Sequence, residues 1–146
     1  MKKLTFFALS LIITVCVFSA CSMPFASCTA KRLRKSMTEY YSNNENYSQL
    51  EGRIVEIRTD ELLIDVTSSN GEFPFREGIN RDYFMLINID SFDLKCGEVI
   101  TFTSAPRQFY DGHHFPIVAI EKEGVVILDF ETGKANLLNW IENDFN

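Results

Sequence analysis

Residues 49–67 read Q-L-E-G-R-I-V-E-I-R-T-D-E-L-L-I-D-V-T, and this stretch decides the fold. Gln49 to Arg58 and Glu61 to Thr67 are both rich in branched apolar residues, and Thr59-Asp60 separates them. Two such runs joined by a two-residue link are typical of a β-hairpin. The segment Ser68 to Gly71 (S-S-N-G) then predicts a turn, because Asn and Gly tolerate the positive φ that tight turns need.

Further runs of strand character follow this hairpin. They cover Tyr83 to Ile89, Glu98 to Ser104, Phe115 to Lys122 and Val125 to Asp129. The run from Glu98 is the clearest, because its hydroxyl and apolar side chains alternate and place Ile100 and Phe102 on one face. Pro106 ends that run, and Glu123-Gly124 predicts the turn before the last one.

The period of the pattern changes after Gly133. Apolar residues fall there on one stripe at helical spacing, namely Leu137, Leu138, Ile141 and Phe145. Trp140 lies at the edge of this stripe, and we expect it to fill the core rather than to stack on a ligand. The whole pattern predicts a mainly β domain, a small antiparallel barrel of five to six strands with a C-terminal amphipathic helix. A sandwich or meander is the alternative.

One segment carries a resemblance to a known fold. Leu94 to Phe102 (L-K-C-G-E-V-I-T-F) resembles the start of a barrel strand in OB-fold domains, and Gly52 stands where a barrel strand must bend. The chain is thus similar, over about Gln49 to Asp129, to the small OB-like lipoproteins of Gram-positive bacteria. It departs from the OB pattern between the third and fourth strands, because Asp90 to Gly97 leaves little room for the usual helix.

The N-terminus has the pattern of a processing signal. Met1-Lys2-Lys3 is followed by an uncharged run from Leu4 to Phe18 and then by Ser19-Ala20-Cys21. This resembles a bacterial lipoprotein signal, which implies a diacylglycerol on Cys21 and cleavage before it. An uncleaved membrane helix is the main alternative, because no charge appears between Lys3 and Lys31. Ordinary secretion is a third.

These signals divide the chain into three parts. We expect residues 1–20 to form the signal peptide, 21–46 a lipidated tether and 47–146 a single globular domain. The tether is poor in apolar residues toward its end, which predicts a flexible coil. Its basic cluster (Lys31, Arg32, Arg34 and Lys35) can lie on anionic lipid headgroups or simply be solvated.

The net charge of the folded part indicates which partners it can bind. From Tyr47 onward the chain has 18 acidic and 8 basic residues, a formal charge of 8 − 18 = −10. Such a surface repels phosphate backbones, so we expect no nucleic-acid partner. Of the cysteines, Cys16 lies in the signal, and Cys28 and Cys96 can either pair or stay separate thiols.

Catalytic motifs are missing from the sequence. Asp111, His113 and His114 could contribute to a metal site, but two usable ligands are too few for zinc, and adjacent histidines diverge in an extended chain. We therefore expect no metal and no cofactor. A metal-dependent extracytoplasmic hydrolase that uses these three residues remains the alternative function.

Two loops are rich in aromatic residues and are the candidate ligand-binding elements. One holds Phe73 and Phe75, and the other holds Phe109, Tyr110, His113 and His114. In OB-folds the loop before the last barrel strand helps to line the ligand face. The rings could form a stacking platform for a sugar or a peptide, or they could fill the ends of the barrel. The sequence thus favours a membrane-anchored, extracytoplasmic binding or accessory domain for an envelope component or a protein partner.

Overall fold

A computed structural model describes residues 23–75, 80–107 and 115–143 of the chain, with side chains from Thr29 onward. The chain divides into two compact units. The first extends to Met37, and the second runs from Thr38 to Phe145.

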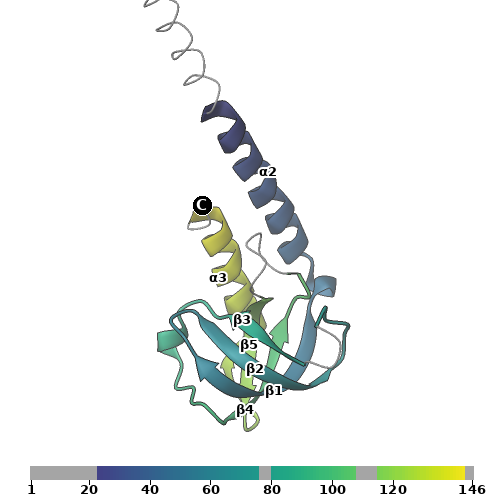
Figure 1. Ribbon diagram of the computed structural model, residues 1–146, viewed down its shortest axis with the longest axis vertical. Helices are drawn as coiled ribbons and strands as arrows, with labels where there is room; N and C mark the ends of the chain where they lie inside the picture. The colour runs from purple at the N-terminus through teal and green to yellow at the C-terminus, as the bar shows by residue number, and fades with distance from the viewer. Residues whose placement is uncertain (1–22, 76–79, 108–114, 144–146) are drawn as a thin grey trace, which may run out of the picture. The chain divides into compact units, whose positions relative to one another are not determined.

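The second unit is built on one sheet of six strands (Figure 1). The strands are β1 (Ser48–Ile57), β2 (Glu61–Ser69), β3 (Arg81–Met85), β4 (Val99–Ser104), β5 (Phe115–Lys122) and β6 (Val125–Leu128). Their order is β3-β2-β1-β4-β5-β6, and a short parallel pairing between β3 and β5 closes the first five strands into a ring. The remaining pairings are antiparallel, so the prediction of a mainly β, OB-like domain is confirmed.

Most strands lie where the sequence predicted them. The hairpin of β1 and β2 turns between Ile57 and Glu61, and β5 has the predicted bounds. The exception is β3, which begins at Arg81 and ends at Met85 instead of continuing to Ile89. A short 3-10 helix, η2 (Ile89–Ser91), follows it because Asn88 adopts a left-handed conformation with φ of 57°.

Alternation along the strands produces one core inside the ring. In β4, Ile100, Phe102 and Ser104 are buried, whereas Thr101 and Thr103 face the outer side and are half-buried. The core gathers the inward side chains of all six strands: Leu50, Ile54, Leu62, Ile64, Val66, Phe84, Ile100, Phe102, Phe115, Ile117, Ile120 and Leu128 are its main members. Most residues between these positions face outward and supply the surface of the sheet, but Val118 is fully buried, where α3 approaches β5.

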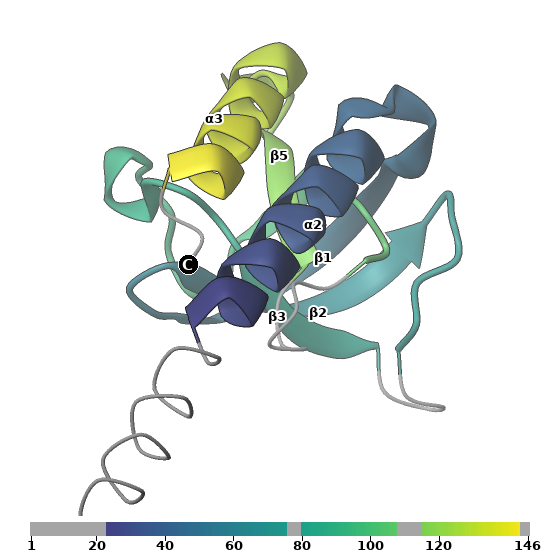
Figure 2. The ribbon, with the colours of Figure 1, turned by 90° about the horizontal axis from the view of Figure 1, so that it is seen from above.

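The C-terminal helix, α3 (Phe130–Asn143), lies over β5 in both views (Figures 1 and 2). It begins earlier than predicted, because the Asp129 carboxylate accepts a hydrogen bond from the Thr132 N–H at 3.0 Å and caps the first turn. Leu137 and Ile141 are buried as expected, but Trp140 is only half-buried and does not plug the core. Phe145 lies outside the described residues.

A second helix, α2 (Met23–Ser42), occupies most of the segment predicted to be a flexible coil. That prediction is wrong for residues 23–42. Lys, Arg, Met, Leu and Ala are good helix formers, and they are frequent between Ala30 and Met37. Neither of the two described α-helices combines the length and apolar character needed to cross a membrane.

The last turn of α2 belongs to the second unit, where tyrosines fix it. Tyr41 is fully buried, and its hydroxyl donates a hydrogen bond to the Arg107 carbonyl at 2.7 Å. The Tyr47 hydroxyl in turn donates to the Tyr41 carbonyl at 2.8 Å, which satisfies one of the carbonyls that a helix end leaves open. Burial raises the pKa of both hydroxyls far above the usual range. The folded unit therefore begins several residues before the predicted boundary at Tyr47.

We predict that Gly133→Ala lowers the free energy of unfolding by about 2 kcal/mol in urea titrations, the usual cost of overpacking a tight contact. A Cβ at Gly133 would lie 2.0 Å from the Val118 carbonyl oxygen, so α3 would have to move away from β5. The matched control is Ala135→Gly, at an exposed site of the same helix, which should cost about 1 kcal/mol. Helix propensity alone predicts that Gly133→Ala stabilises the protein and that Ala135→Gly destabilises it. Stabilisation by Gly133→Ala would therefore contradict the close contact.

Candidate ligand-binding groove

One of the two predicted aromatic loops, with Phe73 and Phe75, lies within the described residues. Phe109, Tyr110, His113 and His114 lie outside the described residues, as does Asp111 of the alternative metal site. Within the described part of the chain, no group of three or more His, Cys, Asp and Glu side chains could hold a metal ion. Phe73 and Phe75 are described, and both are half-buried.

Phe73 and Phe75 pack onto the core rather than presenting free faces. Their rings stack with centroids 5.6 Å apart, and Phe73 meets the buried Phe115 edge-on at 5.4 Å. Phe75 lies 6.4 Å from the buried Phe84 and 6.2 Å from Phe115. Such edge-to-face contacts are favourable for aromatic rings. This arrangement favours the interpretation that the two rings fill one end of the barrel.

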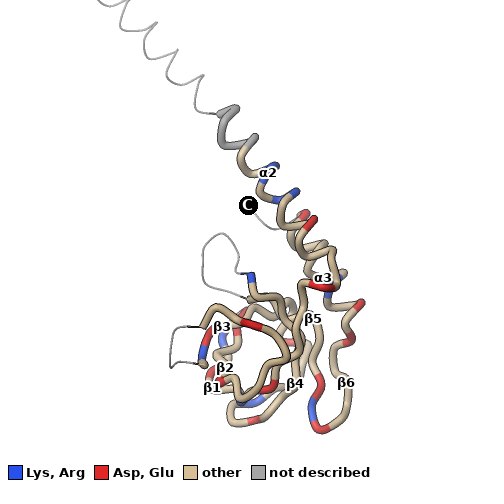
Figure 3. The backbone as a smooth tube through the Cα atoms, turned by 90° about the vertical axis from the view of Figure 1, so that its right-hand side faces the viewer, with Lys and Arg blue, Asp and Glu red and all other residues tan. Residues whose placement is uncertain are grey.

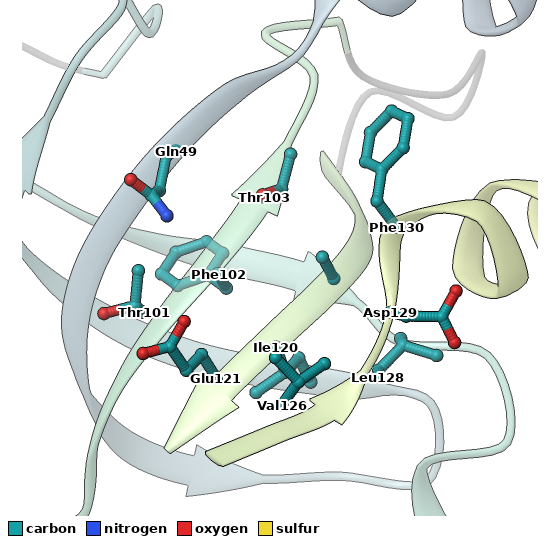
Figure 4. A pocket seen from close by; sticks show the side chains of 11 residues that line it. Gln49, Thr101, Phe102, Thr103, Ile120, Glu121, Val126, Leu128, Asp129 and Phe130 are labelled. Carbon is teal, nitrogen blue, oxygen red and sulfur yellow. The ribbon is translucent and has the colours of Figure 1, made fainter. Parts of the chain in front are cut away.

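A different surface of the sheet is hollowed. We call it the β4–β5 groove: it has a volume of about 220 Å³ and lies on the outer side of β1, β4 and β5, beside β6 and the start of α3 (Figure 4). Its lining is Gln49, Thr101, Phe102, Thr103, Ala119, Ile120, Glu121, Val126, Leu128, Asp129 and Phe130. Strand pairing aligns the polar members, because Gln49 is opposite Thr103, and Thr101 is opposite Glu121.

The polar side chains of this groove are available for a ligand. In the described part of the chain, none of the side chains of Gln49, Thr101, Thr103 and Glu121 has a hydrogen-bond partner. Together they offer an amide, two hydroxyls and a carboxylate. Phe130 adds a ring at one side of the groove, where it meets Tyr47 edge-on at 5.2 Å. Hydrogen-bonding groups beside an aromatic ring suit a neutral or cationic polar ligand and disfavour an anion.

A second hollow lies beside the hairpin of β5 and β6. We call it the Phe92 hollow: its volume is about 440 Å³, and it is lined by Ser91, Phe92, Asp93, Lys122, Glu123, Val125 and Ile127. Lys122, one of these lining residues, donates a hydrogen bond to Glu98 at 2.7 Å, and this bond holds the pKa of the Glu98 carboxyl below its usual value. The apolar part of the lining is Phe92, Val125 and Ile127, of which Phe92 and Ile127 pack against the core.

Sequence reasoning missed both hollows. The alternation of β4 did place Thr101 and Thr103 on one face, but the register that sets them beside Gln49 and Glu121 depends on pairings between distant strands.

Cys96 is exposed and unpaired, and the side chain of Cys28 lies outside the described ones. Cys96 is therefore a free thiol.

We predict that Phe75→Ala lowers the free energy of unfolding by about 2 kcal/mol, because it removes a ring that covers the core end. The neighbouring exposed side chain offers a control, and Glu72→Ala should change stability by no more than about 0.5 kcal/mol. Both are measured by urea unfolding of the full chain. Unchanged stability in Phe75→Ala would show that the ring is free for a ligand instead.

Comparisons with protein-family models, with curated proteins and with solved structures give no match to this chain. Its function is therefore inferred from its own residues. The features that bear on function are the N-terminal pattern, the acidic domain and the two hollows on either side of β6.

Proposed function

We propose that this chain is a lipid-anchored extracytoplasmic protein whose OB-like domain binds an envelope component or a protein partner without catalysing a reaction. Support for the anchor is the order of residues from Met1 to Cys21: a short basic head, an apolar run, small residues and a cysteine. A diacylglycerol on the Cys21 sulfur would hold the mature chain on the membrane, with the domain on the extracytoplasmic side.

The observation that carries the binding role is the β4–β5 groove. It places unpartnered hydrogen-bonding side chains beside the Phe130 ring on a rigid sheet, which is how proteins position polar groups for recognition. Glu121 gives the groove a carboxylate, and the domain from Tyr47 carries a formal charge of 8 − 18 = −10. A neutral or cationic partner suits this surface, and nucleic acid does not.

The helical form of α2 supports a role for the basic cluster at the membrane. Lys31 and Lys35 are 8 and 12 residues from Met23, which corresponds to about 12 to 18 Å along a helix. With α2 lying along the membrane, these charges would come within a Debye length of anionic headgroups, and each would contribute up to about 1 kcal/mol. The lipid and the basic residues would act together as two membrane signals.

We predict that protein isolated from the membrane fraction begins at Cys21 and carries the mass of a diacylglyceryl group. Intact-mass spectrometry and the N-terminal peptide provide the measurement. Cys21→Ser should abolish the adduct and release the chain from membranes, because one sulfur holds the lipid. An unmodified chain that begins at Met1 would contradict the lipid anchor and indicate an uncleaved helix.

We also predict that the groove contacts the partner in cells. A photoreactive phenylalanine analogue at Thr101 should form an adduct on irradiation, because Thr101 lines the groove. The same analogue at Thr67, an exposed position on β2 outside the groove, is the control and should form none. Equal adducts at both positions, or none at either, would contradict binding at the groove.

A further inference from the structure

The strand β6 stands at the end of the sheet. It pairs with β5 on one side, and no described segment pairs with its other side. Its sequence, V-V-I-L, has no charge and no proline, which are two of the features that usually protect an edge strand. Val125 and Val126 are 62 % and 61 % exposed, the largest exposed fractions among the large apolar side chains of the described residues. The edge thus combines open backbone groups with accessible apolar surface.

The two hollows lie on opposite faces of this edge. Val126 lines the β4–β5 groove, whereas Val125 and Ile127 line the Phe92 hollow. Side chains of successive residues in a strand point to opposite faces of the sheet. A strand added beside β6 would therefore direct alternate side chains toward Val126 on one face and toward Phe92 on the other.

Charge distinguishes between the candidate occupants of this edge. Glu121 and Glu123 stand at one end of β6, and Asp129 and Glu131 at the other; Figure 3 shows acidic positions at both ends of the strand. The nearby Lys122 is already paired with Glu98. Two copies of β6 in antiparallel pairing would bring acidic ends together, which is unfavourable. A segment with basic residues at its ends is complementary.

We propose that β6 binds an extended segment of a partner protein as an added antiparallel or parallel strand, with apolar side chains at alternate positions and Lys or Arg at its ends. This inference rests on the proposed binding function and names the class of its partner. Main-chain hydrogen bonds to the open edge supply affinity, and the two faces of β6 supply selectivity for the side chains.

The test uses a fluorescent peptide, Lys-Lys-Val-Thr-Val-Thr-Val-Lys-Lys, and the full chain in detergent micelles, with anisotropy as the readout. We expect saturable binding that weakens as salt rises, because the ends are held by charge. Glu121→Gln combined with Glu123→Gln should weaken binding and flatten this salt dependence. A peptide with Glu in place of every Lys, and one with Pro at its centre, should not bind.

The matched pair of protein variants is Val126→Lys and Val99→Lys. Val126→Lys adds a charge to the open edge and should weaken binding by about tenfold, or 1.4 kcal/mol. Val99 is 44 % exposed but lies on β4, which is paired on both sides, so Val99→Lys should have no effect. Equal effects of the two variants, absence of binding, or sedimentation of a dimer that Val126→Lys dissociates would each overturn the proposal. If the peptide does not bind but the analogue at Thr101 still forms its adduct, the proposed binding function is supported and only this class of partner is contradicted.

Discussion

The close approach of β1 and β2 at Gly52 is the constraint on which the sheet depends. A Cβ at this position would lie 2.5 Å from the Ile64 methyl and 2.7 Å from the Asp65 carbonyl oxygen, so only glycine fits. The pairing register shifts at the same place, between Glu51 and Gly52, and such a bulge bends a strand and increases its twist. Because β1 pairs with both β2 and β4, its bend turns two neighbours at once and lets the sheet curl into a ring.

The candidate groove is a product of that curvature and of the register it fixes. Gln49, Thr103 and Ala119 lie in one row across β1, β4 and β5, and Thr101 and Glu121 lie in the next. The small Ala119 leaves the centre of the surface low, while Phe130 stands at its side. Asp129 performs two tasks here, since it lines the groove and also caps α3. The helix start and the groove wall are thus set by the same turn.

Local patterns in the sequence predicted much of the fold. The hairpin link at Thr59-Asp60, the alternation in β4 and the bounds of β5 were all correct, because each depends on neighbours in the chain. The helix α2 was missed, because a polar composition fits both a coil and an exposed helix. Tyr41 shows why composition misled: the partner of its buried hydroxyl is the Arg107 carbonyl, which is 66 residues away.

The candidate site was harder to predict than the fold. Aromatic content drew attention to Phe73 and Phe75, but rings of this kind serve packing as well as recognition, and these two contact Phe115. The polar row of the β4–β5 groove contains no unusual residue and no motif. Only the alignment of three strands from distant parts of the chain makes Gln49, Thr103 and Glu121 neighbours, so no local signal could have identified them.

The β3–β5 pairing, which closes the ring, has fewer residue pairs than the other strand pairings of the ring. β3 and β5 meet over two residue pairs, Phe84 with Phe115 and Met85 with Pro116, and Pro116 has no N–H to donate. Ring contacts supplement this short ladder, because Phe73 and Phe75 both touch Phe84 and Phe115 across the joint. Resistance to local opening at the β3–β5 pairing therefore depends on aromatic packing more than on backbone hydrogen bonds. The β3–β5 pairing can then open locally while the β1–β2 hairpin and the β4 pairings stay intact.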